Sequence, residues 1–268
     1  MWKRSRVYED DIPFLESITD YVKEKMRDVR EPCHVMIDSA ARKRSEKSTT
    51  TTAFLREEER RALIGLCERY VDMFEKKAGI LSVRILVSPK GCEAQQYHLD
   101  YKRDSQFDCR TLFVALTPST PENCTEYLEF KNEHDEFLFQ KRVDKCSDAS
   151  GMTTIPVTNV RKKCLIVKPH DIVFMNTSKI PHRRGPTFHS TFTRIVLNID
   201  ITPHIKELSK FEDTDYLDSL SNGCIASQKV VDDLHSEIVI QVLPSSSSSS
   251  SENHSTTVVV ASPTQSRL

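Results

Sequence analysis

The sequence predicts a mainly β protein whose core is a double-stranded β-helix, a jelly-roll or cupin-like arrangement of two facing sheets, buttressed by N-terminal helices. Two observations favour this fold class. Between residues 80 and 203, many short segments rich in β-branched and aromatic residues alternate with turn residues. Many short strands at this spacing favour a closed or two-sheet architecture. Before residue 80, apolar residues recur at helical spacing instead.

Two amphipathic helices are expected before the β-rich region. Residues 11–28 and 54–77 each place apolar side chains three or four positions apart, so each would present one apolar face to a core. Gly79 is suited to end the second helix. Residues 38–52, between the two helices, lack periodicity and are interpreted as an exposed loop.

The β-rich region contains eight expected strands, separated by turn residues. They are 80–88, 94–101, 111–117, 125–130, 136–140, 163–168, 171–176 and 193–201. Residues 141–161 are interpreted as a long irregular insertion, the kind of loop that often forms a lid or a binding loop. After Pro203 the pattern is helical to about residue 220.

We divide the chain into four regions on these patterns. They are an N-terminal helical support region at 1–79, a catalytic β core at 80–203, a C-terminal extension at 204–243 and a tail at 244–268. The tail contains seven consecutive serines from Ser245 to Ser251. We expect it to be disordered, because its composition cannot bury enough apolar surface to fold.

The overall composition excludes several classes of protein. The 268 residues include 38 Lys and Arg against 39 Asp and Glu, so there is no strong signal for nucleic-acid binding. The eight cysteines form no C-x-x-C pair and are interpreted as reduced thiols. No apolar stretch reaches membrane-spanning length. We therefore expect a cytoplasmic or nuclear protein.

The strongest functional signal is a pair of potential metal ligands in the segment 94–101. Side chains alternate between the two faces of a strand, so His98 and Asp100 lie on the same face. His182 is the best candidate for a third ligand, and His189 is its rival, although the segment around His189 resembles a connecting loop. Two histidines and one carboxylate leave coordination positions open, as in non-haem Fe(II) oxygenases.

A second signal is an arginine that opens the last expected strand. Arg194 shares a face with Val196 and Asn198, and a guanidinium inside a core requires an anion. Its planar fork matches a carboxylate, which suits the far carboxylate of 2-oxoglutarate. Two interpretations of Arg183 and Arg184 stay open, namely contacts to an anionic substrate or an exposed turn.

This ordered set resembles the 2-oxoglutarate- and Fe(II)-dependent dioxygenases. The order H-x-D, distal His and then Arg on the next strand is theirs, and the surrounding segments are most similar to the phytanoyl-CoA-dioxygenase-like branch. Those segments are Leu86–Gly91, Leu116–Asn123 and Lys168–Asp171. The resemblance covers roughly residues 80–201. It also implies that Gln95, three residues before His98, lies near the co-substrate.

The resemblance implies an enzyme that couples oxidative decarboxylation of 2-oxoglutarate to C–H oxidation of a second substrate by dioxygen. His98, Asp100 and His182 would then hold Fe(II), while Arg194 and Gln95 would contact 2-oxoglutarate as a small-molecule co-substrate. Two alternatives are a catalytically inactive β-helix that binds a ligand or a protein, and a cupin-type dioxygenase without 2-oxoglutarate. Arg194 argues against the latter, which has no keto acid to anchor. The primary substrate and the oligomeric state are not indicated.

Overall fold

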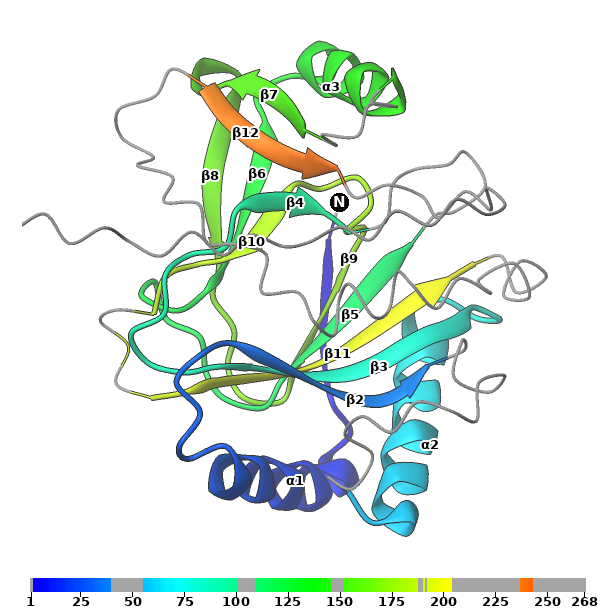
Figure 1. Cartoon of the computed structure of the whole chain (residues 1–268). Helices are drawn as coiled ribbons and strands as arrows, with labels where there is room; N and C mark the ends of the chain where they lie inside the picture. The colour runs from blue at the N-terminus through cyan, green and yellow to red at the C-terminus, as the bar shows by residue number, and fades with distance from the viewer. Residues whose placement is uncertain are drawn as a thin grey trace, which may run out of the picture.

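The protein is mainly β, and its strands form two six-stranded sheets (Figure 1). The computed structural model describes residues 2–39, 55–100, 109–145, 152–187, 190, 192–203 and 237–242. We name the sheet with strand order β1-β9-β5-β11-β3-β2 sheet A, and the sheet with order β7-β12-β4-β10-β6-β8 sheet B. The paired strands are antiparallel except β4 and β12, which are parallel. The prediction of a mainly β protein is therefore confirmed.

Sheet A contains the longest strands. Its members are β1 (Lys3–Arg6), β2 (Cys33–Ser39), β3 (Gly79–Ser88), β5 (Arg110–Ala115), β9 (Asp171–Met175) and β11 (Arg194–Thr202). The central strand β11 pairs with β3 on one side and β5 on the other. Its residues Ile195, Leu197 and Ile199 belong to the large outer core, whereas Val196 belongs to a separate inner cluster. The predicted alternation of β11 is confirmed.

Sheet B contains shorter strands. They are β4 (Tyr97–Leu99), β6 (Thr125–Phe130), β7 (Met152–Pro156), β8 (Val160–Leu165), β10 (His182–Arg184) and β12 (Glu237–Val242). The two sheets face each other, because Phe113 and Val196 of sheet A pack in one apolar cluster with Leu165 and Tyr127 of sheet B. The functional side chains described below lie in this space between the sheets.

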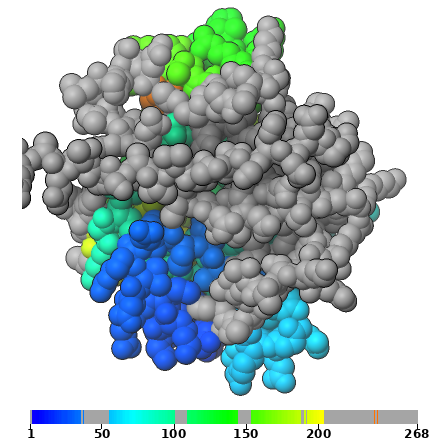
Figure 2. All heavy atoms as spheres, in the orientation of Figure 1, coloured from blue at the N-terminus to red at the C-terminus, as the bar shows by residue number. Residues whose placement is uncertain are grey.

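Two N-terminal helices cover the outer face of sheet A, as predicted. They are α1 (Ile12–Lys25), which follows a 3-10 helix at Glu9–Asp11, and α2 (Glu57–Phe74). Their buried residues form one core with the outer residues of sheet A. Figure 1 shows both helices on the side of sheet A away from sheet B, and they form the lower surface in Figure 2. No described helix is long and apolar enough to cross a membrane.

The expected strand at 136–140 is wrong, because these residues belong to helix α3 (Glu133–Lys145). The apolar run around Phe139 was interpreted as β, but Phe139 and Val143 lie one helical turn apart and both pack against sheet B. Asn132 starts the helix, since its Oδ1 accepts a hydrogen bond of 2.9 Å from the backbone N–H of Asp135. The sequence therefore contains a local signal for the start of a helix, the cap residue Asn132, next to an apolar segment that also suits a strand.

The irregular insertion expected at 141–161 is also wrong where the structure describes it. Helix α3 continues to Lys145, β7 forms an edge of sheet B, and a 3-10 helix at Val157–Asn159 leads directly into β8. Of the loop expected at 38–52, residues 38 and 39 complete β2, and the rest lies outside the described residues. The helical segment expected after Pro203 and the tail also lie outside them.

Besides β7 and β10, three strands come from the flanking regions before residue 80 and after residue 203, where no strand was predicted. β1 and β2 belong to the N-terminal region and form the two edges of sheet A, and β12 belongs to the C-terminal extension and lies between β4 and β7. The flanking regions therefore complete both sheets as well as supporting them. The six cysteines whose side chains the structure describes carry free thiols.

Candidate metal centre

Two neighbouring strands of sheet B bring the predicted ligands together. His98 lies in β4 and His182 in β10, and the two residues are direct antiparallel partners. Their imidazole centroids lie 4.6 Å apart. Asp100 follows the end of β4, where its backbone N–H donates to the Thr177 carbonyl at 3.1 Å. Residues 84 positions apart in the sequence thus share one point in space because β4 and β10 pair.

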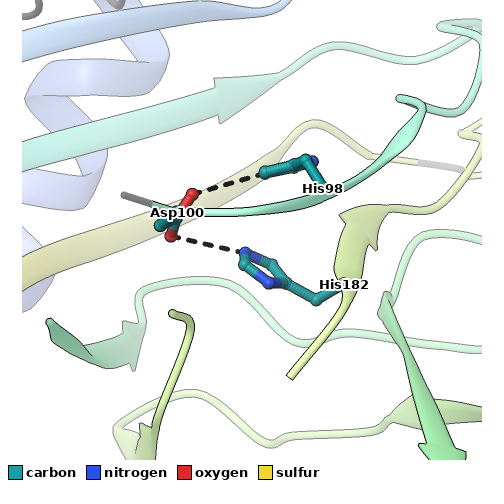
Figure 3. A group of neighbouring side chains, drawn as sticks. All are labelled: His98, Asp100 and His182. Carbon is teal, nitrogen blue, oxygen red and sulfur yellow. Dashed lines mark ion pairs between the residues drawn. The ribbon is translucent and has the colours of Figure 1, made fainter. Parts of the chain in front are cut away.

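The donor atoms of His98, Asp100 and His182 all lie within 4.8 Å of one another. Oδ1 of Asp100 lies 3.5 Å from Nε2 of His98, and Oδ2 lies 3.4 Å from Nε2 of His182. Figure 3 shows the carboxylate beside the two rings and facing both, with one oxygen directed at each. Three side chains therefore converge on one small volume, as the sequence predicted.

Backbone carbonyls orient both imidazoles. Nδ1 of His98 is 3.0 Å from the Gln96 carbonyl, and Nδ1 of His182 is 2.9 Å from the Ile180 carbonyl. A carbonyl oxygen only accepts, so each Nδ1 carries the proton and donates it. The Nε2 lone pair of a neutral ring then faces the centre of the site. This is the usual arrangement of metal-binding histidines, whose second nitrogen is fixed by a hydrogen bond outside the coordination sphere.

The three side chains are strongly coupled electrostatically. Burial alone would raise the pKa of Asp100, but the two imidazoles, His182 foremost, hold it well below its ordinary value. Burial alone would lower the pKa of His182, and the Asp100 carboxylate raises it above its ordinary value. The cluster is therefore built around an ionised carboxylate, which is the form that binds a cation.

The opposite face of the same strands is packed and contains no site residue. Tyr97 and Leu99 belong to an apolar cluster with Leu128. Arg183 points to this face, because its guanidinium lies 4.2 Å from the Tyr97 ring centroid and its Nε donates to Glu126 at 2.6 Å. The predicted alternation of Tyr97 and His98 is correct. The interpretation of Arg183 as an exposed turn residue is wrong, since its side chain is buried and paired.

Arg194 lies at the start of β11 and is buried. Its NH2 donates to Thr125 Oγ1 of sheet B at 2.6 Å, while its Nε has no hydrogen-bond partner among the described residues. Burial lowers the pKa of Arg194 to about 10. No carboxylate pairs with it in the part of the chain that the structure describes. Arg194 is thus a buried cation that a bound anion would neutralise.

Gln95 contacts a different part of the site. Its Oε1 accepts a hydrogen bond of 3.1 Å from the Arg184 backbone N–H, and its own N–H donates to the Arg184 carbonyl at 3.0 Å. The side-chain oxygen therefore holds the end of β10, and a role for Gln95 toward the co-substrate stays a prediction. The rival ligand His189 lies outside the described residues.

Sequence reasoning missed His34. This residue lies in β2, and its Nδ1 is buried with no hydrogen-bond partner among the described residues. Burial, together with the charge of Arg84, lowers the pKa of His34 to about 4. The available signal was strand alternation, since Val35 and Ile37 point into the outer core.

Comparison with solved structures identifies the fold. The structure of EvdMO1 has a TM-score of 0.50 and 12% sequence identity, covering 75% of this chain and 46% of that chain. The chain shares its fold with EvdMO1. Similar structures also include HygX from Streptomyces hygroscopicus with nickel and 2-oxoglutarate bound, with a TM-score of 0.48, 12% identity and coverage of 76% and 83%.

A further similar structure is SnoK, described as a non-heme alpha ketoglutarate dependent carbocyclase from nogalamycin biosynthesis. Its TM-score is 0.45 and its identity is 15%, covering 75% of this chain and 79% of that chain. No protein-family model matches the chain, and no curated protein sequence matches it at a significant level. At these identities the likeness concerns the fold alone, and the chemistry depends on the residues of the site. The phytanoyl-CoA-dioxygenase-like branch stays a prediction.

The residues present fit a divalent transition metal. Two imidazole nitrogens and one carboxylate oxygen converge without a fourth protein ligand among the described residues. Such a set leaves positions for other molecules on the metal, which is the pattern of non-haem Fe(II) sites. The second nitrogen of each imidazole is already satisfied by the backbone. A metal ion would thus meet a set of donors that the fold has oriented in advance.

Proposed function

We propose that the protein is an Fe(II)- and 2-oxoglutarate-dependent oxygenase built on a double-stranded β-helix. In this proposal His98, Asp100 and His182 hold the metal, and Arg194 binds the far carboxylate of 2-oxoglutarate. The reaction is a hydroxylation of an unidentified substrate. The bound metal would supply the oxidative chemistry, using dioxygen and the decarboxylation of 2-oxoglutarate to oxidise a C–H bond.

One observation carries the proposal, namely the convergence of two imidazoles and one carboxylate in the space between the sheets. A buried carboxylate between two histidines has a simple structural alternative, an ion pair that only stabilises the fold. Both Nδ1 atoms point away, at backbone carbonyls, and both Nε2 atoms face the carboxylate. This orientation suits an imidazolium–carboxylate pair, and it equally suits neutral rings whose Nε2 lone pairs bind a cation. The metal site is supported by the convergence of three donors of the type that non-haem iron sites use, with no fourth protein ligand among the described residues.

Arg194 supplies the second support. Removing one partner of a buried ion pair typically costs about 3–5 kcal/mol, because the other charge is left unpaired. A buried guanidinium without a carboxylate therefore destabilises the fold. A protein keeps this arrangement where a ligand completes it. A dicarboxylic keto acid can do so, because its keto-acid end chelates a metal while its far carboxylate reaches a cation some distance away. Arg194 and the metal ligands come from different sheets, so both sheets would contact one co-substrate.

The walls of the site also fit an oxidative reaction. Phe113 lies with its ring centroid 6.4 Å from that of His182, and Val196 and Met175 pack in the same inner cluster. Through Phe113 this apolar cluster borders His182, where it would keep water from one side of the proposed metal ligands. A dry wall strengthens the electrostatic contacts of the bound molecules and limits side reactions. The protein's own contribution is to orient the ligands, bind the co-substrate and exclude water.

Two measurements on the full chain test the proposal. Calorimetric titration should show that 2-oxoglutarate binds to protein loaded with Mn(II), an oxygen-stable substitute for Fe(II), and binds weakly without metal. Succinate should form from 2-oxoglutarate in air when Fe(II) is present, and not in the Asp100→Asn variant. The proposal fails if metal and 2-oxoglutarate bind independently of each other, or if the Asp100→Asn variant still produces succinate.

A further inference from the structure

A second arginine approaches the Arg194 side chain from sheet B. Arg184 is two residues after His182 in β10, so both side chains leave the strand on the same face. Its direct partner across the β10–β6 pair is Thr125. Thr125 Oγ1 accepts the 2.6 Å hydrogen bond from Arg194. The two arginines therefore meet around one threonine, at the same end of the space between the sheets.

Neither guanidinium has a carboxylate partner among the described residues. Buried carboxylates elsewhere in the interior are already engaged, Asp100 by the imidazoles, Asp200 by Arg84 and Ser82, and Glu126 by Arg183. Burial lowers the pKa of Arg194, and the charge of Arg184 lowers it further. Two cations thus repel each other in a buried region, where the interaction is poorly screened.

Three buried donor atoms of the two arginines are unsatisfied. Nε and NH1 of Arg184 and Nε of Arg194 have no hydrogen-bond partner in the part of the chain that the structure describes. A buried donor without a partner costs roughly 1–3 kcal/mol, and more when it is charged. One carboxylate offers two oxygens with about four acceptor positions in total. A single carboxylate between the guanidiniums would satisfy these donors and remove the repulsion.

The backbone of Arg184 is fixed from both sides. Its N–H and its carbonyl both bond to Gln95, at 3.1 and 3.0 Å. The N–H of the next residue, Gly185, donates to the Cys124 carbonyl at 3.0 Å. A Cβ at Gly185 would lie 2.8 Å from that carbonyl oxygen, so only glycine allows this approach. Arg184 thus extends from a rigid position, which is what precise binding of an anion requires.

We propose that Arg184 and Arg194 together bind one carboxylate, the far carboxylate of 2-oxoglutarate, and that Arg184 is a specificity-determining residue for this co-substrate. The inference rests on the proposed function and adds a second residue to its co-substrate site. It also corrects the interpretation of Arg184 as an exposed turn residue, since the side chain is half-buried and its Nε and NH1 atoms are buried. A keto acid without a far carboxylate would leave both cations unpaired.

Calorimetry with two keto acids tests the inference. Mn(II)-loaded wild type, Arg184→Gln and Arg184→Lys are titrated with 2-oxoglutarate and with pyruvate, which lacks the far carboxylate. Arg184→Gln should raise the Kd for 2-oxoglutarate roughly ten- to a hundredfold and leave pyruvate binding unchanged. Arg184→Lys should be intermediate, because it keeps the charge but loses the planar fork. The exposed residue Arg161 of β8 provides a matched control, Arg161→Gln, with no effect on either ligand.

Three outcomes would overturn the inference. The first is unchanged 2-oxoglutarate affinity in Arg184→Gln while Arg194→Leu loses it, which leaves the proposed function intact and assigns Arg184 to another anion. The second is equal weakening of 2-oxoglutarate and pyruvate, which indicates a general loosening of the site. The third is a wild-type protein that does not distinguish the two keto acids, in which case the proposed function itself falls. Circular dichroism of each variant confirms folding, and Arg184→Lys keeps the test valid if Arg184→Gln unfolds.

Discussion

The two sheets differ in what they contribute to the stability of the protein and to its proposed metal site. The central strands of sheet A are long, with ten residues in β3 and nine in β11, and α1 and α2 bury their outer face. The two strands of sheet B that carry the histidines have three residues each, and only a smaller apolar cluster lies behind them. Sheet A therefore provides most of the buried apolar surface, whereas sheet B provides the proposed metal ligands. Stability and chemistry should respond to different substitutions.

The largest expected effect falls on sheet B. Replacing His98, Asp100 or His182 by Ala should lower Fe(II) or Mn(II) affinity by on the order of a hundredfold or more, since even partners outside the coordination sphere contribute 10- to 100-fold. The thermal stability of the metal-free protein should change much less. Metal titration monitored by calorimetry, alongside melting curves, measures both.

His189→Ala is the matched control for that experiment, because His189 is the rival ligand by sequence. It should bind metal like wild type. Equal losses from His182→Ala and His189→Ala would leave the distal ligand unassigned. A loss from His189→Ala alone would transfer the assignment to that residue.

The next effect concerns Arg194, the one proposed site residue that sheet A contributes. Arg194→Leu should cost about 3–5 kcal/mol of 2-oxoglutarate binding, which is a hundredfold or more in Kd. Metal affinity should stay near wild type, because Arg194 is not a metal ligand. Arg194→Lys should be intermediate. If Arg194→Leu binds 2-oxoglutarate normally, the proposal reduces to a metal-binding β protein of unknown chemistry.

A substitution in the core of sheet A should show the converse behaviour. Leu197 is completely buried in β11 between the sheet and the helices. Leu197→Ala should lower the free energy of unfolding by about 2–5 kcal/mol. Leu138, which is 41% exposed in α3, provides the control, and Leu138→Ala should change stability by no more than about 0.5 kcal/mol. Denaturant unfolding measures both. A large loss of metal affinity in folded Leu197→Ala would contradict the division between the sheets.

The smallest effect is expected from the Ser-rich tail. A chain ending at Leu243 should have the stability and metal affinity of the full chain, because the removed composition cannot pack against the β core. A chain ending at residue 236 is the informative contrast, since it also loses β12, which pairs with β4 and β7. Unfolding curves should separate the two truncations. A cooperative loss of stability in the chain that ends at Leu243 would show that the tail contributes to the fold.

Local alternation explains which parts of the site could be predicted. His98 and Asp100 are two residues apart and Arg194 opens a clearly apolar strand, so their faces followed from the period of a strand. The choice of His182 as the third ligand rested only on its position along the chain, and the pairing of β10 with β4 was seen only in the structure. The packing of β6 next to β10 could not be read from any local pattern. Thr125 and Arg184 therefore became a pair only in the structure.

Other errors came from tertiary context. The segment around Phe139 is apolar enough for a strand. It is helical instead, and Phe139 and Val143, four residues apart, pack in the same apolar cluster from one face of α3. His34 lies in a strand whose role depends on its pairing with β3, some 50 residues later. The helices before residue 80 were predictable because their apolar faces repeat over several turns, whereas single edge strands give a weak signal.

The position of β12 determines when sheet B can be completed during synthesis. Ile240 and Gln241 pair with Tyr97 and His98, so β4, which also pairs with β10, gains its second neighbour only after residue 242 has left the ribosome. Every strand of sheet A lies before residue 203. A nascent chain can therefore complete sheet A while sheet B still lacks an internal strand. A chain that stops before β12 should therefore contain a complete sheet A and all three proposed ligands, but lack one internal strand of sheet B.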